Sequence, residues 1–132
     1  MKKVYLICPV RSCSEADRRF ADEYVAELEK NGFSVHYPPR DVDQTDDGVG
    51  LAISEAHREA MLGCDEVHVI WDATSVGSHF DFGMAFMLQA WKKIPIVLAR
   101  PAQPTPTKSY GNKLAAVAER DRERLRRESA PS

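Results

Sequence analysis

The sequence predicts an α/β domain whose core is a short parallel sheet of four to five strands with flanking helices. Four short apolar runs alternate with segments of helical period, and the connections between them are short. This alternation is typical of parallel strands joined by right-handed helical crossovers. The runs are also too continuously apolar for an antiparallel sheet with one face in water. At 132 residues, the chain has the usual size of one domain.

The first half of the chain contains two expected strands with a helix between them. Residues 3–8 (KVYLIC) form an apolar, β-branched run of strand type. Ser14 suits the cap of the helix that follows, and Gly32 suits the residue just beyond its end. A second strand is expected over residues 33–37, where the Pro38-Pro39 pair ends it.

The second half repeats this order after a long polar and acidic loop over residues 40–50. We expect a helix over residues 51–62, a strand over 66–71, a loop over 72–78, then a third helix and a last strand over 94–99. The apolar residues of the third helix share one side, and the two methionines among them are interpreted as core: Phe80, Met84, Met87, Leu88 and Trp91.

The character of the chain changes after residue 100. A proline-rich stretch leads into a charged, helix-prone segment over residues 112–127. Its apolar residues are sparse, which indicates a surface helix or a contact within an oligomer: Leu114, Val117 and Leu125. The sequence therefore predicts an α/β domain over residues 1–100, followed by a proline-rich segment and a charged C-terminal helix or tail over residues 101–132.

The composition excludes several classes of protein. The chain has 18 basic and 20 acidic residues, a net charge of −2, so no basic field favours a nucleic acid polymer. No segment is long enough to cross a membrane, and no signal peptide is evident, so a cytoplasmic protein is expected. The three cysteines lack CxxC spacing, and the four histidines lack metal-site spacing. We therefore expect neither a metal nor a cofactor.

Ligands of open parallel sheets bind at the carboxyl ends of the strands, and one segment there carries polar groups suited to chemistry. Asp72, Ser75, Gly77 and Ser78 follow the third strand. Gly77 permits a tight turn, and exposed amides with two hydroxyls suit a phosphate. Asp81 is expected in the first helical turn, as an ionised nucleophile or as support for a cationic sugar. Alternatively, Ser78 only caps the helix and Asp81 only complements its dipole.

A second candidate segment follows the first strand. Arg11 and Ser12 lie at the mouth of this strand, where they suit a phosphate or a carboxylate. The alternative is a solvated loop arginine.

Together these motifs resemble the nucleoside 2-deoxyribosyltransferase family, which includes nucleoside 5′-monophosphate N-glycosidases. The resemblance covers residues 3–100 and is most specific from Ser75 to Ala85 (SVGSHFDFGMA). It implies a flavodoxin-like, Rossmann-like doubly wound sheet, and a homodimer or higher homo-oligomer.

The resemblance also implies roles for single residues. Asp81 matches the carboxylate that attacks the anomeric carbon, and Tyr5 matches a tyrosine that positions it. Ser75 and Gly77 match the residues that hold a 5′-phosphate, and Arg11 matches a loop arginine.

Two residues depart from the family pattern. The nucleophile is Asp rather than Glu, so the side chain that carries the carboxylate is one methylene shorter. A shift of about 1 Å in the position of a catalytic group costs on the order of a hundredfold in rate. His57 stands where the family has an Asp that holds the sugar or moves a proton. This histidine is either an acid or base that works near neutral pH or a partly exposed residue of the second helix.

The leading hypothesis is therefore hydrolysis or transfer at the N-glycosidic bond of a nucleoside or nucleoside 5′-monophosphate. The alternative is a nucleotide-binding or sensing module without catalysis. A receiver-type signalling domain is disfavoured, because the first strand ends in Ile7-Cys8-Pro9 without an acidic pair.

Overall fold

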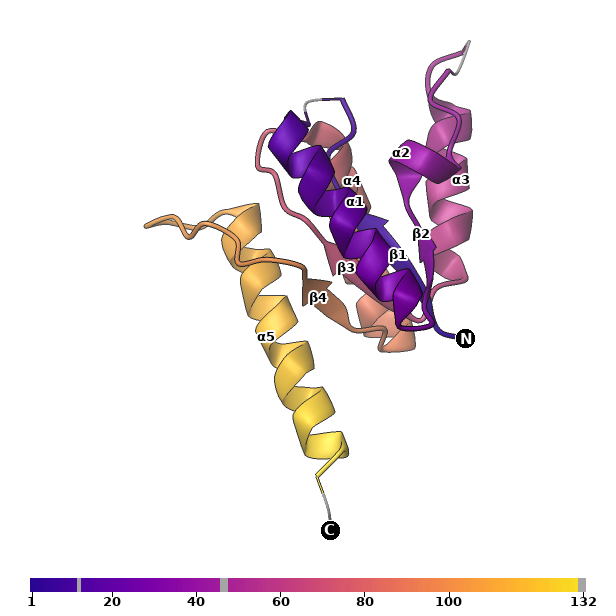
Figure 1. Ribbon diagram of the computed structural model, residues 1–132. Coiled ribbons are helices and arrows are strands. Elements are labelled where there is room, and N and C mark those ends of the chain that lie inside the picture. Colours follow the sequence, from indigo (N-terminus) through magenta and orange to yellow (C-terminus); the bar gives the residue numbers. More distant parts are fainter. Residues whose placement is uncertain (12, 46–47, 131–132) are drawn as a thin grey trace.

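The computed structural model describes residues 1–11, 13–45 and 48–130, and these residues form a single α/β sandwich around one sheet (Figure 1). The elements in chain order are β1 (Lys3–Ile7), α1 (Glu15–Lys30), β2 (Ser34–His36), α2 (Pro38–Asp41), α3 (Leu51–Leu62), β3 (Glu66–Val69), α4 (Val76–Lys92), β4 (Ile96–Leu98) and α5 (Tyr110–Glu128). The four strands are parallel in the order β2-β1-β3-β4. The predicted doubly wound parallel sheet is confirmed.

The local signals that predicted the bounds of α1 and α3 were correct. Ser14 caps α1, because its Oγ accepts a hydrogen bond from the backbone N–H of Asp17 at 3.1 Å. Gly32 follows that helix with a left-handed φ of 92°, which favours glycine. The bounds of α3 match the predicted range of residues 51–62.

The polar loop after β2 begins with a short helix that was not predicted. The prolines at 38 and 39 end the strand, but they also start α2, because proline at the first helical positions is already fixed at a helical φ. The Asp41 carboxylate closes this turn by accepting a 2.8 Å hydrogen bond from the N–H of Tyr37.

Alternation along β1 sends successive side chains to opposite faces of the sheet. Val4 and Leu6 pack in the core beneath α1. Tyr5 and Ile7 face the other core, which is shared with α3, α4 and α5. All four are at most 1% exposed, and Tyr5 is therefore held rigidly on the side of the sheet where α3 and α4 lie.

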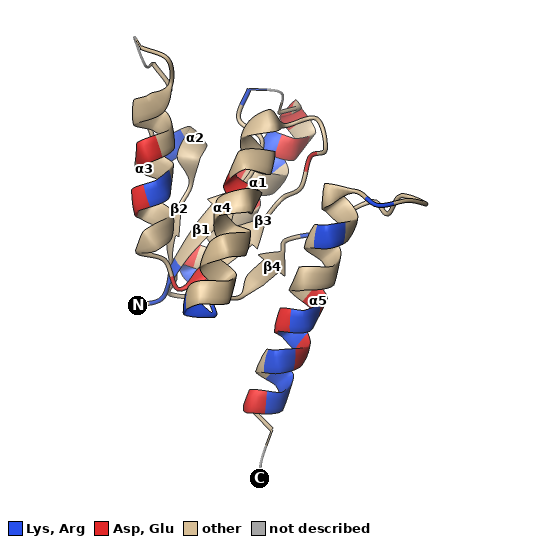
Figure 2. Ribbon diagram, turned by 180° about the vertical axis from the view of Figure 1, so that it is seen from behind, with Lys and Arg blue, Asp and Glu red and all other residues tan. Residues whose placement is uncertain are grey.

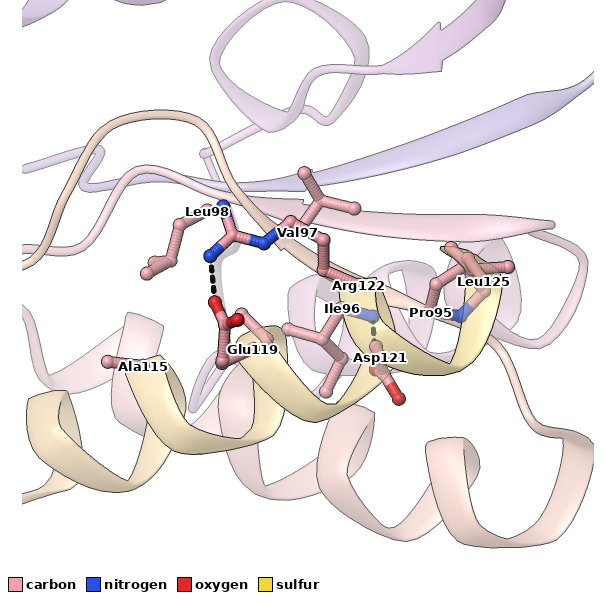
Figure 3. A pocket seen from close by; sticks show the side chains of 10 residues that line it. Pro95, Ile96, Val97, Leu98, Ala115, Glu119, Asp121, Arg122 and Leu125 are labelled. Atoms are coloured by element: carbon pink, nitrogen blue, oxygen red, sulfur yellow. Dashed lines mark hydrogen bonds and ion pairs between the residues drawn. The ribbon is translucent and has the colours of Figure 1, made fainter. Parts of the chain in front are cut away.

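The C-terminal helix packs on the sheet. Leu114 and Val117 are buried in the core shared with α3 and α4. Asp121 is 2% exposed and accepts hydrogen bonds at 2.8 Å from the Ile96 N–H, at the start of the edge strand β4, and from Gln89 on α4. Figure 3 shows this carboxylate beside a pocket of about 230 Å³ between β4 and α5. The predicted domain boundary near residue 100 stays a prediction.

The outward faces of two helices differ in character. Alternating Lys, Arg, Asp and Glu residues run along α5 (Figure 2). On α4, Met87 is 71% exposed, so its interpretation as a core residue was wrong. The core side of α4 is instead formed by Phe82, Ala85 and Leu88. Within the described residues, no helix is both long and apolar enough to span a membrane.

Candidate active site

The Asp81 carboxylate lies at the centre of a buried polar cluster. Asp81 is 6% exposed and faces Tyr5 and α3. Its Oδ2 accepts a hydrogen bond from the Tyr5 hydroxyl at 3.0 Å and lies 3.5 Å from Nδ1 of His57. Within the described residues, Oδ1 accepts no hydrogen bond. One carboxylate oxygen is thus fixed in place, and the other is uncommitted.

The position of Asp81 in its helix differs from the expectation. Because α4 begins at Val76 rather than after Ser78, Asp81 lies in the second turn. The helix dipole, which acts within the first turn, therefore explains little of how this carboxylate is held. The direct contacts with Tyr5 and His57 hold the carboxylate in place instead.

Three aromatic rings, those of Tyr5, His36 and His57, form a cluster, and two of them, Tyr5 and His57, contact this carboxylate. The Tyr5 ring stacks on His36 at a centroid distance of 5.1 Å and meets His57 edge-on at 6.2 Å. His36 and His57 are 6.4 Å apart. Burial, reinforced by the negative charge of Asp81, raises the pKa of Tyr5 far above its usual value of 10.0. Tyr5 therefore stays a neutral hydrogen-bond donor at all physiological pH values.

Two of these rings carry a buried nitrogen without a partner. Nε2 of His36 and Nε2 of His57 are both enclosed, and neither makes a hydrogen bond within the described structure. Buried polar atoms are nearly always paired, and an exception usually indicates a water or a ligand. Both atoms belong to the ring cluster around Asp81, so this cluster has unused hydrogen-bonding capacity.

His36 is a candidate site residue that the sequence reasoning missed. It is the last residue of β2, and the parallel register places it opposite Tyr5. The available signal was a polar residue at the carboxyl end of a strand next to the one that carries Tyr5. The strand order was needed to use that signal.

His36 should make the stability of the protein depend on pH. Burial, opposed in part by the charge of Asp41, lowers the pKa of His36 below 6.5. The unfolded chain therefore binds this proton first, so the free energy of unfolding falls as the pH drops through 6.5 toward the folded pKa. We expect His36→Gln to flatten this decline in urea titrations from about pH 7.5 to about pH 5. An identical decline in both proteins would contradict this assignment.

The start of α4 is capped by Ser75 and not, as the alternative interpretation had it, by Ser78. The Ser75 Oγ accepts a hydrogen bond from the Ser78 N–H at 3.2 Å and donates one to the Ser78 Oγ at 2.9 Å. Both hydroxyls are buried and already have partners. Ser75 caps the helix because its backbone is extended, whereas Ser78 is already helical.

Gly77 does not form the tight turn that was expected. It lies in the first turn of α4 with no left-handed φ, and a Cβ added there would meet no atom within 4 Å. A Cβ added at Gly83, in the middle of α4, would also meet no atom within 4 Å, so close packing does not require a glycine at position 83. The space beside Gly77 is open, and the first N–H groups of a helix have no intrahelical acceptor. An anion could reach the backbone there.

The remaining predicted site residues are not part of this cluster. Arg11 is exposed and, within the described residues, makes no ion pair; Ser12 lies outside the described residues. Asp72 closes a turn, accepting hydrogen bonds from the N–H and hydroxyl of Thr74 at 2.8 and 2.7 Å. It lines a cavity that also includes His79. The structure thus brings together Tyr5, His57 and Asp81, but not Asp72.

Two other kinds of chemistry find little support in the described residues. No group of three or more His, Cys, Asp or Glu side chains in them is arranged to hold a metal ion. Cys8 follows the last residue of β1, but burial raises the pKa of its thiol to about 12, so the thiol is neutral at pH 7.

The fold and the cluster define a class of protein: a flavodoxin-like α/β domain with a buried carboxylate beside the central strands. No protein-family model matches the chain, and no curated protein does. The solved structures that share the fold include the following two. One is a 2-deoxyribosyltransferase from the psychrotolerant bacterium Bacillus psychrosaccharolyticus, described as a biocatalyst for the synthesis of antiviral and antitumoral nucleosides. The other is a conserved protein from Enterococcus faecalis V583.

The likeness to both is a likeness of fold. The 2-deoxyribosyltransferase has a TM-score of 0.62 and 17% identity, over 80% of this chain and 77% of that one. The Enterococcus protein has a TM-score of 0.59 and 22% identity, over 90% of this chain and 76% of that one. The fold implied by the family resemblance is therefore confirmed.

Proposed function

We propose that the protein cleaves the N-glycosidic bond of a nucleoside or a nucleoside 5′-monophosphate in a reaction that depends on Asp81. One observation carries this proposal: the buried carboxylate has one oxygen fixed by Tyr5 and His57 and the other uncommitted. A solved structure of the same fold is a 2-deoxyribosyltransferase, which supports the choice of substrate class. Hydrolysis is favoured over transfer, because the site offers contacts for a phosphate.

Asp81 is the proposed nucleophile. Its Oδ1 forms a bond to C1′ of the sugar while the C1′–N bond breaks, and the electron pair of that bond leaves with the base. Tyr5 holds Oδ2 and so fixes the direction in which Oδ1 points. Water then attacks C1′, the bond between C1′ and Oδ1 breaks, and the sugar leaves with a hydroxyl at C1′ while Asp81 regains its carboxylate. In a transfer reaction, a nitrogen of a second base attacks C1′ in place of water and loses its proton.

His57 is the proposed acid and base. Its Nδ1 lies beside Asp81, and its Nε2 lacks a partner. An imidazole gains and loses a proton near neutral pH, which suits delivery of a proton to the departing base. In the second step His57 takes a proton from the attacking water.

The start of α4 is the proposed phosphate site. The N–H groups of Val76 and Gly77 lie in the first turn, beside open space, where the helix dipole favours an anion. Arg11 is an exposed cation on the neighbouring loop. Ser75 and Ser78 support this site by capping the helix, because their hydroxyls already bond to each other.

A second function, a nucleotide-binding module without catalysis, is supported by a different observation. The side chain that carries the carboxylate at position 81 is one methylene shorter than in the family that the sequence resembles. Such a module would gain thermal stability with a nucleotide but release no base. A chromatographic assay of base release with a panel of nucleosides and 5′-monophosphates, run beside thermal unfolding, separates the two functions.

We also propose a cytoplasmic homodimer or higher homo-oligomer. The outer side of α4 carries apolar side chains that are 51–83% exposed: Val76, Phe80, Phe86, Met87 and Trp91. Exposed apolar surface of this kind is typical of protein contacts. Light scattering checks the oligomeric state, and a monomer at micromolar concentration would contradict it.

A further inference from the structure

A second cavity lies on the side of α4 that faces away from Asp81. It has a volume of about 770 Å³ and is bounded by the loop after β3, the segment after β4 and the starts of α1 and α5. His79 points into it from α4. Residues 79 and 81 of a helix lie about 200° apart around its axis, so the two sites are separated by the helix itself.

The walls of this cavity are held in place by specific contacts. The Asn112 side chain accepts a hydrogen bond from the Thr105 N–H at 3.1 Å and donates to the carbonyls of Thr105 and Thr107 at 3.0 and 2.7 Å. These bonds fix the segment after β4 against α5. A Cβ at Gly111 would lie 3.0 Å from the indole nitrogen of Trp71. Glycine at this position therefore allows the indole to lie against the helix start.

Aromatic rings form one wall. Trp71 and His79 are 4.6 Å apart between centroids, and His79 and Tyr110 are 5.4 Å apart. The His79 Nδ1 lies 2.8 Å from the Ser75 carbonyl oxygen, which can only accept, so Nδ1 carries the proton. Trp71 is only partly buried, and its indole N–H makes no hydrogen bond within the described residues. A planar ring can stack on this wall.

The charged side chains that line the cavity carry a net positive charge, because three cations, Arg100, Lys108 and Lys113, face the two carboxylates of Asp17 and Asp72. The Asp17 carboxylate is paired with Arg100 at 2.9 Å. Asp72 is occupied in part by its turn with Thr74. Lys108 makes no ion pair within the described residues, and Lys113 lies 4.8 Å from the centre of the Tyr110 ring. Two ammonium groups are thus available to an anion.

We propose that this cavity binds a planar aromatic ring that carries a phosphate, with a mononucleotide as the chemical class. The ring stacks on Trp71 and Tyr110, and the phosphate is bound by Lys108 and Lys113. The site is distinct from the Asp81 cluster and does not depend on catalysis there. His79 and Asp81 share α4, so a ligand in this cavity contacts the helix that positions the carboxylate.

Trp71 reports on this site directly. The test uses the Trp91→Phe, Asp81→Asn protein, in which Trp71 is the only tryptophan and turnover is not expected. Titration with AMP should change the indole fluorescence in a saturable way, after correction with free tryptophan for absorption by the nucleotide. Adenosine alone and inorganic phosphate alone should each bind at least about tenfold more weakly, because each offers half of the contacts.

Substitution of the two lysines decides where the nucleotide binds. Lys108→Gln with Lys113→Gln should weaken the AMP-dependent change in Trp71 fluorescence at least about tenfold. Arg11→Gln alters the proposed phosphate site at the start of α4, which lies outside this cavity, and should leave the Trp71 signal unchanged. Both lysines are exposed, so circular dichroism should show an unaltered fold. Absence of a saturable signal would overturn the proposal. A signal that survives the lysine substitutions would also overturn it. A signal that Arg11→Gln removes would overturn it as well, because that result places the nucleotide near the start of α4.

Discussion

Asp81→Asn should reduce base release by about a thousandfold or more, because the variant loses the oxygen nucleophile while keeping the shape of the side chain. The carbonyl of the new side-chain amide can still accept the hydrogen bond from Tyr5, so the fold should be retained, with a free energy of unfolding within about 2 kcal/mol of the wild type. Chromatography of the released base gives the rate, and urea denaturation gives the stability.

Tyr5→Phe is the matched control for that substitution. It removes the hydroxyl that holds Oδ2 but leaves the carboxylate in place, so activity should fall less than in Asp81→Asn. Tyr5 is fully buried and its ring stacks on His36, and phenylalanine preserves that packing. Equal activity in wild type and Asp81→Asn would contradict the proposed role of the carboxylate.

Leu114→Ala should lower the free energy of unfolding by about 2–5 kcal/mol, the usual cost of a leucine removed from a core. Leu114 is 0% exposed and belongs to the core shared with the sheet, α3 and α4. If α5 is an integral part of the folded unit, loss of this side chain should affect the single unfolding transition of the whole chain. Urea denaturation followed by circular dichroism measures the effect.

Leu125→Ala provides the comparison for Leu114→Ala on the same helix. Leu125 is 41% exposed, so its truncation should cost about 1 kcal/mol or less. A loss as small for Leu114→Ala as for Leu125→Ala, or a separate early transition, would show that α5 unfolds independently of the sheet.

The sheet could be predicted because its strands carry strong local signals. Buried parallel strands are continuous apolar runs, and each of the four was found at its predicted place, although shorter at its ends. Ser14 and Gly32 gave correct helix ends for the same reason, since a cap depends on the residue itself and its nearest neighbours. Strands and helix ends can be predicted from the sequence where interactions between neighbouring residues determine them.

The site was less predictable because it depends on contacts between distant segments. Tyr5 and His57 were selected through the family resemblance, and Asp81 was selected both from its position after a strand and through that resemblance. The structure places the three within contact of one another. His36 was missed because its place beside Tyr5 follows from the strand order. Asp72 was included because it follows a strand, but its turn directs it to a different cavity.

The two largest differences concern helices whose partners could not be inferred. Met87 was interpreted as core from helical spacing, but the sheet-facing side of α4 is set by Phe82 and Leu88, and Met87 is exposed. On α5 the sparse apolar residues gave little sign of packing. Its attachment also uses a charged side chain, because the Asp121 carboxylate bonds to the backbone of β4. A buried Asp cannot be recognised from an apolar pattern.

The most direct test of the proposed bond cleavage is to follow the oxygen of water. Purified protein is incubated with nucleoside 5′-monophosphates in ¹⁸O-labelled water, and the products are analysed by mass spectrometry. Hydrolysis at C1′ predicts free base without label and a sugar phosphate that carries one ¹⁸O, with neither product formed by Asp81→Asn. Label in inorganic phosphate or in the base, or no product while a nucleotide raises the melting temperature, would contradict cleavage of the N-glycosidic bond.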